Sequence, residues 1–380
     1  MIQFHEKPFD DATQLKLEIF RGYIREWLPV FLTQYVGGRG QYEYVNIFDF
    51  FAGPGHDATG HPGSPLIIVE ELKQFCAEGH KASGLDVRML FNDVNPDHIA
   101  RLRQEVAKIA CGNRCCHTEY SAMSFQESLR KNLPVMQDTN SANLVIMDQF
   151  GVKEVTPDVI RQLVACGTTD ILFFISSSYI RRFINAPELG GQFDMDAEEV
   201  KTLDYNVMHR FVCDYFRGKL NGQKCYLAPF SIKKGGNIHG VIFGSGSLFG
   251  LDKFLKVCWK KDAITGEANY NIDGDFAWSG EKSLFDADNA ITKVCWFEKE
   301  LTRFIREYSP TNHQLYEFCL TKGFLPKKAR EILGPLCKAG KLDIVGLDAA
   351  RPSADGAFYM TWEQYNECDP RIRVVARSNA

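Results

Sequence analysis

Residues 48–65 read FDFFAGPGHDATGHPGSP, with four glycines and three prolines after an aromatic segment. The stretch begins as an aromatic strand and passes directly into a run of glycines and prolines. Such a run between a strand and a helix lets a ligand approach backbone amides that a Cβ would shield. The stretch therefore predicts a ligand site at the end of a strand, around Asp49, Ala52, Gly53 and Gly55.

The spacing of these glycines limits the kind of ligand. It differs from the dinucleotide pattern GxGxxG, and no Walker lysine follows, so the sequence supports phosphate binding only weakly. A merely tight connection between strand and helix is the alternative interpretation.

Apolar strands alternate with amphipathic helices around this stretch. We expect strands near residues 43–51, 87–94, 115–123, 143–151 and 170–178, and helices near 12–36, 64–79, 96–111, 125–133 and 156–166. Because most of these strands are apolar throughout, they predict a parallel α/β sheet covered on both faces. Residues 179–222 are expected to form a helical insertion, and residues 224–247 a hairpin that completes the sheet.

The carboxyl-terminal part has a different pattern. Helices are expected at 295–309, 311–323 and 325–341, followed by strands at 342–348 and 357–362. Three short helices followed by two strands predict a winged helix-turn-helix. The predicted domains are therefore residues 1–290, a winged helix at 291–365 and a tail at 366–380.

Composition narrows the classes of function. The 380 residues carry a formal net charge of −4, so a nucleic-acid surface would have to be a local basic patch. No apolar run is long enough to span a bilayer and no secretion signal precedes the first helix, so we expect a cytoplasmic protein without membrane contact. The 12 cysteines do not form the two spaced pairs that a zinc site needs. We therefore expect reduced thiols and no metal site.

Further candidate residues lie beyond the glycine stretch. Asp148 and Phe150 follow the strand at 143–151, where a carboxylate can accept an amine hydrogen and an aromatic ring can stack on a planar base. Core packing is an equal interpretation for Phe150. Arg181 and Arg182 follow the next strand as candidate phosphate ligands, with a solvated surface pair as the alternative.

The predicted recognition helix of the winged domain begins with Pro326. Three basic residues follow within its first turns, Lys327, Lys328 and Arg330, as suits contact with phosphates. The alternative is a winged helix used for protein contact or dimerisation.

The motif DFFAGPG resembles motif I of class I S-adenosylmethionine (SAM)-dependent methyltransferases. That resemblance implies a Rossmann-like sheet that binds SAM through Asp49, Ala52, Gly53 and Gly55, with the ribose held by Asp93 in LFNDVNP. The GSPL segment that contains Ser64 is similar to one in bacterial rRNA adenine-N6 methyltransferases. Taken together, the motifs look most like the three-Cys-motif partner protein (TcmP) family, whose members are paired with a radical-SAM-like protein that bears three cysteines.

One motif departs from the adenine-N6 pattern. Those enzymes carry D/N-P-P-Y/F, whereas this chain has Asp148-Gln149-Phe150-Gly151 without the two prolines. The expected function is SAM-dependent methylation of nucleic acid, at a base amino group, together with the radical-SAM-like partner. The alternative is a non-catalytic protein that targets this partner to nucleic acid.

Overall fold

The computed structural model describes residues 7–33, 42–79, 85–109, 116–149, 151–185, 193–203, 208–267, 270–271, 293–347 and 356–377. The chain divides into two compact units. The larger comprises residues 1–257 and 268–275, and the smaller comprises residues 258–267 and 276–380. The predicted boundary at residue 290 therefore lies downstream of the first crossing between the units.

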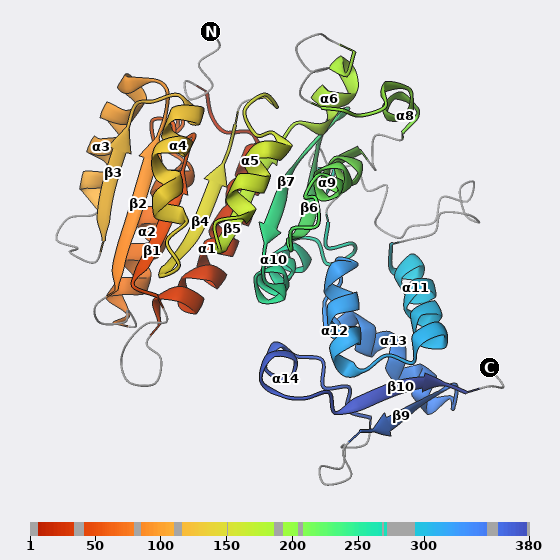
Figure 1. The fold of residues 1–380 in the computed structure, drawn as a ribbon. Coiled ribbons are helices and arrows are strands. Elements are labelled where there is room, and N and C mark those ends of the chain that lie inside the picture. The colour runs from red at the N-terminus through yellow and green to blue at the C-terminus, as the bar shows by residue number, and fades with distance from the viewer. Residues whose placement is uncertain are drawn as a thin grey trace. The chain divides into compact units, whose positions relative to one another are not determined.

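The larger unit is built on a sheet with the strand order β3-β2-β1-β4-β5-β7-β6-β8 (Figure 1). Its strands are β1 Tyr44–Asp49, β2 Asp86–Asn92, β3 His117–Ser121, β4 Ser141–Met147, β5 Thr168–Ile175, β6 Tyr226–Lys234, β7 Asn237–Ser245 and β8 Tyr270–Asn271. The first five strands are parallel, and β7 pairs antiparallel with both β5 and β6. The predicted fold class, a class I methyltransferase-like sheet, is confirmed.

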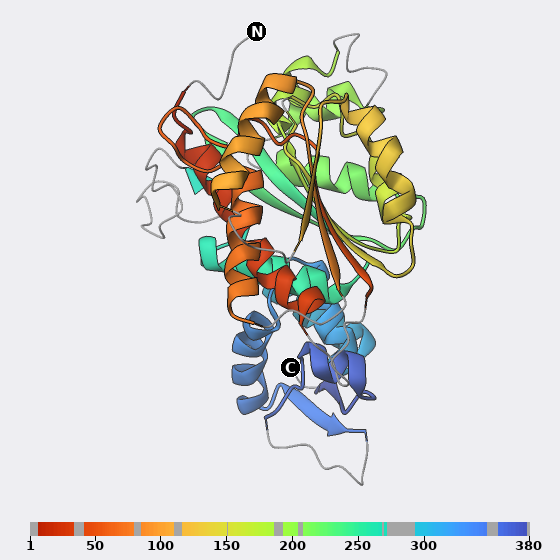
Figure 2. The same ribbon diagram turned by 90° about the vertical axis from the view of Figure 1, so that its left-hand side faces the viewer.

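Helices cover both faces of this sheet, as Figure 2 shows edge-on for α1, α2 and α10 on one side and α4 and α5 on the other. The helices are α1 Asp11–Leu32, α2 Ser64–Ala77, α3 Pro96–Ile109, α4 Phe125–Met136, α5 Pro157–Val164, α6 Ser177–Phe183, α8 Ala197–Thr202, α9 Met208–Gly218 and α10 Leu248–Lys261. The last of these crosses the boundary between the units. Most of the described residues of the insertion predicted at 179–222 are helical, in α6, α8 and α9.

Alternation along the strands decides which side chains reach which face. Phe48 of β1 and Val145 of β4 belong to the apolar cluster that includes α4, α5 and α9. Because successive side chains in a strand point to opposite faces, Asp49 and Ile146 turn toward α1 and α2. This parity places polar groups from several strands under one helix, α1.

The hairpin of β6 and β7 turns at Gly235 and Gly236, as predicted. On its α9 side, Gly240 lies against the buried ring of His209. The Nδ1 atom of that ring is 2.8 Å from Ser177 Oγ, and its Nε2 is 3.1 Å from the carbonyl oxygen of Val241. The histidine therefore joins α9, α6 and β7, and leaves no room for a larger residue at position 240.

The smaller unit contains the winged helix. Its elements are α11 Lys293–Tyr308, α12 Asn312–Thr321, α13 Pro326–Lys338, β9 Leu342–Gly346, α14 Trp362–Glu367 and β10 Ile372–Ala376. Stacked rings hold its core together, with the centroids of Phe297 and Phe324 3.9 Å apart and their planes at 7°. A capping box at Thr311 and Gln314 begins α12.

The second strand of the wing is not where the sequence placed it. The predicted strand at 357–362 is irregular, because Tyr359 has a φ of +47° that interrupts extended backbone. The second strand of the wing is instead β10, at Ile372–Ala376, which pairs antiparallel with β9. Asn312 accounts for this arrangement, because its Oδ1 accepts the N–H groups of Arg371 and Ile372 at 2.9 and 3.3 Å. The residues assigned to a tail at 366–380 thus include part of the domain.

Replacement of Gly240 by alanine is expected to destabilise the larger unit by about 1–3 kcal/mol, because the new Cβ would overlap the His209 ring and lie 2.5 Å from the carbonyl oxygen of Phe230. Urea denaturation followed by circular dichroism measures the change. Gly236→Ala is the matched control, since nothing lies within 4 Å of its Cβ position. Equal stability of the two variants would contradict this packing account.

Candidate functional site

The glycine-rich turn lies between β1 and α2, where the sequence placed it. Gly53 and Gly55 have φ angles of +63° and +100°, which L-residues with side chains seldom adopt. A Cβ on Gly55 would also lie 3.1 Å from Leu102 and 3.3 Å from Leu66. The turn is therefore packed between α2 and α3 and needs glycine for its backbone as well as for space.

Asp93, just after β2, joins this turn. Its Oδ2 accepts the N–H of Gly53 at 3.0 Å, and its Oδ1 accepts the N–H of Asn95 at 2.8 Å. His98 Nδ1 is 3.2 Å from the same Oδ1. A carboxylate has about four acceptor positions, so Asp93 supports the turn and keeps room for about one more donor.

Asn92 links the ends of three neighbouring strands. Its amide nitrogen donates to the carbonyl oxygens of Phe50 and Met123, and its Oδ1 accepts from the Ser121 hydroxyl at 2.6 Å. The backbone N–H of Ala52 donates to the Asn92 carbonyl. These bonds fix the edge at which the predicted cofactor residues meet.

Asp49 is the most unusual group of the site. It is fully buried, its Oδ1 accepts the N–H of Phe51 at 3.2 Å, and its Oδ2 has no hydrogen-bond partner. Burial raises the pKa of Asp49 to about 7; the nearby side chain of Ser64 and the N–H of Phe51 oppose this rise, and the charges of Asp148 and Asp93 add to it. A buried carboxylate with an open oxygen is suited to a cationic ligand.

The turn is braced by Asp57, which the sequence analysis did not single out. Its Oδ1 accepts the N–H groups of Thr59 and His61, and its Oδ2 accepts the N–H of Phe9 at 2.6 Å. Burial opposes ionisation, but these backbone donors outweigh it and hold the pKa of the Asp57 carboxyl well below its usual range. The spacing D-A-T-G-H is a local signal for the bonds within the loop, whereas nothing local indicates Phe9.

A second residue that the sequence analysis missed is Lys16 of α1. Its Nζ is 2.7 Å from Oδ1 and 2.5 Å from Oδ2 of Asp148, the predicted acceptor. The two side chains are 10% and 18% exposed. The same ammonium lies over the ring of Phe174, 4.6 Å from its centroid. An isolated lysine on an amphipathic helix carries no signal that would have identified this contact.

A row of side chains crosses the sheet on the face that α1 covers. It contains Asp49 at the end of β1, Asp148 just after β4, Phe174 of β5 and His239 of β7. The rings of Phe174 and His239 lie 5.9 Å apart and 12° from parallel. Burial lowers the pKa of His239 to about 4, with the charges of Lys234, Lys16 and Arg182 acting in the same direction and Asp10 opposing them. His239 is therefore neutral at pH 7, and its Nδ1 is buried without a partner.

The loop after β4 is held by Gln149 rather than by prolines. Gln149 is 2% exposed, and its Oε1 accepts the N–H groups of Glu154 and Val155 at 3.0 and 3.2 Å. Phe150, the predicted stacking residue, lies outside the described residues. Its predicted role therefore stays a prediction.

The two arginines after β5 differ in their contacts. Arg181 donates to the carbonyl oxygens of Val200 and Lys201, so its guanidinium fastens α6 to α8. Arg182 is exposed and donates to Asn237 Oδ1 at the tip of the β6–β7 hairpin. Of the pair, Arg182 keeps the more accessible charge for a phosphate.

In the winged helix, the three basic residues of α13 differ in their exposure and contacts. Lys327 and Arg330 are exposed on the side opposite the buried Ala329 and Leu333. Lys328 is half-buried, lies over the Trp259 ring and is 3.5 Å from Glu331. Lys327 and Arg330 are thus the more available pair for an external anion.

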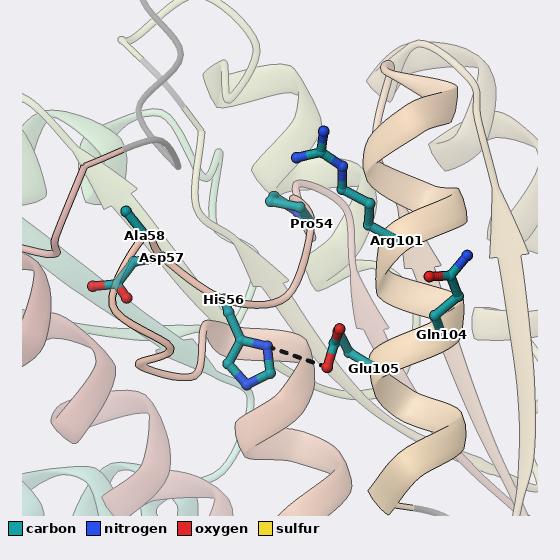
Figure 3. Close-up of a pocket in the computed structure, with 7 residues that line it drawn as sticks. All are labelled: Pro54, His56, Asp57, Ala58, Arg101, Gln104 and Glu105. Carbon is teal, nitrogen blue, oxygen red and sulfur yellow. Dashed lines mark ion pairs between the residues drawn. The ribbon is translucent and has the colours of Figure 1, made fainter.

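A hollow of about 420 Å³ lies beside the glycine turn, between residues 54–58 and α3 (Figure 3). His56 Nδ1 is 3.6 Å from Glu105 Oε2 on its floor, and Arg101 points toward Pro54. None of the predicted cofactor residues lines it. The hollow is therefore separate from the row of polar groups under α1.

In the part of the chain that the structure describes, no three His, Cys, Asp or Glu side chains form a group that could hold a metal ion. Over the same residues, no helix has the length and apolar character needed to cross a membrane.

A protein-family model matches the carboxyl-terminal part of the chain. The family model of the GMT-like wHTH domain matches residues 272–349, which include α11, α12, α13 and β9. This match agrees with the winged helix seen in the smaller unit. No curated protein sequence matches the chain at a significant level.

Among solved structures, about two thirds of this chain is similar to methyltransferases at low identity. Trm1 from Pyrococcus horikoshii, solved with S-adenosyl-L-methionine, is 9% identical with a TM-score of 0.36, over 65% of this chain and 59% of that one. Magnesium protoporphyrin IX methyltransferase from Synechocystis PCC 6803, with bound SAH, is 9% identical with a TM-score of 0.33, over 64% and 91%. TYW2 from P. horikoshii is 12% identical with a TM-score of 0.32, over 65% and 67%. This chain thus spans less than two thirds of the Trm1 chain, and scores this low assign no activity to it.

The raised pKa of Asp49 makes a prediction about stability. Because its folded pKa of about 7 exceeds the unfolded value near 4, the folded state binds more protons between those limits and loses stability as the pH rises from about 4 to 7. Asp49→Asn removes this loss and is expected to be more stable than wild type by about 2–4 kcal/mol at pH 8, with little difference at pH 4. Urea denaturation at both pH values tests this. A wild-type-like pH profile for Asp49→Asn would contradict the assignment.

Proposed function

We propose that the protein is a SAM-dependent methyltransferase that acts on nucleic acid. The observation that carries the proposal is the buried Asp49, whose open oxygen lies at a turn formed by two glycines with positive φ. SAM carries an ammonium group that suits this carboxylate, and it supplies a methyl group on a sulfonium. Asp49, Gly53, Gly55, Ser64 and Asp93 would hold it.

The chemistry that remains for the protein is positioning. When a methyl group passes from sulfur to an amine nitrogen, the S–C bond breaks as the N–C bond forms, and the nitrogen then releases a proton to solvent. In-line transfer depends on alignment more than on acid–base strength. Asp148 would orient the target amine, because each of its oxygens keeps an acceptor position beside the bond to Lys16.

Nucleic acid is proposed as the substrate because the chain joins this site to a winged helix. Lys327 and Arg330 expose two positive charges on one side of α13, the helix that reads the groove in many winged domains. A base amino group, as in the adenine-N6 enzymes, is the target that suits a carboxylate acceptor. A radical-SAM-like protein with three cysteines is the proposed partner.

A second candidate function is that of a non-catalytic nucleic-acid-targeting partner of that radical-SAM-like protein. The absence of prolines after Asp148 favours it, as does the occupation of that carboxylate by Lys16. The two functions differ in one respect, since only the first requires methyl transfer.

Titration calorimetry of SAM and of S-adenosylhomocysteine (SAH) tests the cofactor site. Wild-type protein is expected to bind both, and Gly53→Asp to lose at least about 30-fold in affinity, because it adds a second negative charge to a residue bonded to Asp93 and position 53 has a positive φ. Gly79→Asp is the matched control, since Gly79 has a φ of +75° and open space around it. No binding by folded wild-type protein would overturn the proposal.

Fluorescence anisotropy with labelled single- and double-stranded oligonucleotides tests the nucleic-acid surface. Lys327→Gln/Arg330→Gln is expected to weaken binding about tenfold or more and to lower the slope of log K against log salt by about 2. Lys299→Gln/Arg303→Gln on α11 removes the same charge and serves as the control. If both double variants bind equally, α13 is not the contact surface.

A further inference from the structure

We propose that Lys16 is a positioning residue of the target pocket, whose ammonium group holds the Asp148 carboxylate in a fixed orientation at the end of β4. The inference rests on the proposed function, and it deepens that function by assigning a role to α1.

The first support is the geometry of the ion pair. Lys16 Nζ contacts both oxygens of Asp148, at 2.7 and 2.5 Å, so the carboxylate cannot rotate without losing one contact. The side chains of Lys16 and Asp148 are 10% and 18% exposed, compared with 23% and 36% for Lys253 and Glu26, another ion pair that α1 makes. Water therefore screens the Lys16 pair less, and the loss of one partner leaves a poorly solvated charge.

The second support is the surroundings of Lys16. Phe174 lies beneath its ammonium, and the ring of His239 lies beside that of Phe174. A cation over an aromatic face is attracted to it and gains orientation from it. Lys16 is thus held from two sides before any substrate enters.

The third support is what the loop after β4 lacks. Two prolines would set the backbone after Asp148, but Gln149 and Phe150 occupy those positions in the sequence, and Gly151, with a φ of +88°, follows them. Gln149 anchors the backbone through Glu154 and Val155, which leaves the orientation of the Asp148 side chain to another group. Lys16 is the cation that contacts it among the described residues.

The charge of Asp148 also reaches Asp49. The neighbours that influence Asp49 are Asp148 and Asp93, which raise its pKa after burial, and Ser64 with the Phe51 N–H, which lower it. Removal of the Lys16 ammonium would leave the charge of Asp148 uncompensated. The pH at which a cationic ligand loses affinity for Asp49 should then move upward.

The test compares full-length wild type with Lys16→Met, Lys16→Arg, Asp148→Asn and the double variant Lys16→Met/Asp148→Asn. Lys253→Met, Glu26→Gln and their double variant form a matched cycle on an ion pair between α10 and α1. The measurements are thermal melting, SAH titration from pH 6 to 8.5, and transfer of tritiated methyl from SAM to single-stranded DNA and RNA oligonucleotides of mixed sequence.

Lys16→Met is expected to lower the melting temperature more than Lys253→Met does, and the additional Asp148→Asn change should restore at least about half of that loss. The SAH affinity of Lys16→Met should equal that of wild type at pH 8.5. On acidification, its affinity should begin to fall at a pH about half a unit higher than in wild type. Its kcat should drop at least about tenfold with KM for the oligonucleotide nearly unchanged, and Lys16→Arg should recover most of it.

The outcomes separate the two proposals. If wild type fails to bind SAH, the proposed function is wrong, and the role of Lys16 is lost with it. If wild type binds SAH but the Lys16→Met cycle is additive and its pH profile matches that of Lys253→Met, the role of Lys16 alone is overturned. Because the melting cycle and the pH profile need no methyl acceptor, failure of every oligonucleotide as substrate leaves both of these results decisive.

Discussion

The structure of the larger unit depends on one constraint, which is that carboxylates buried at the edge of a parallel sheet must find compensating donors. Asp49, Asp57 and Asp148 all lie at the edge where β1 and β4 end. A carboxylate taken out of water costs several kcal/mol unless hydrogen bonds or a cation replace its hydration. Phe9 and Lys16 supply donors to Asp57 and Asp148, while one oxygen of Asp49 stays open. That remaining oxygen is the strongest physical argument for a bound cation.

The N-terminal segment therefore does more than cover the sheet. Over residues 9–16 it contacts the glycine loop through Phe9, the hairpin tip through the pair of Asp10 with Lys234, and the end of β4 through Lys16. These contacts join parts of the chain that lie 48, 224 and 132 residues away in sequence. Loosening this segment would disturb the cofactor turn and the proposed target pocket together.

The core of the winged helix is built on stacked aromatic rings, and the ammonium of the nearly buried Lys293–Glu267 ion pair lies over one of them, Phe324. Phe297, Phe318 and Phe324 stack between α11 and α12 and the start of α13. This apolar core leaves Lys327 and Arg330 on the outer side of α13, where they cost little and attract anions.

The sequence by itself determined what depends on neighbours along the chain. The alternation of strands and helices, the glycine turn, the hairpin and the helices of the winged domain follow from periodicity, turn chemistry and capping, all of which act over a few residues. Asp93 was assigned through the resemblance of the motifs to methyltransferases. Only the tertiary structure decided the pairing of Lys16 with Asp148, the bond from Phe9 to Asp57 and the use of residues 372–376 as the second wing strand. Each of these depends on strand parity or on a distant anchor such as Asn312, and a local pattern does not specify which remote donor meets a given carboxylate. The framework of the site was therefore predictable, but the partner that orients Asp148 was not.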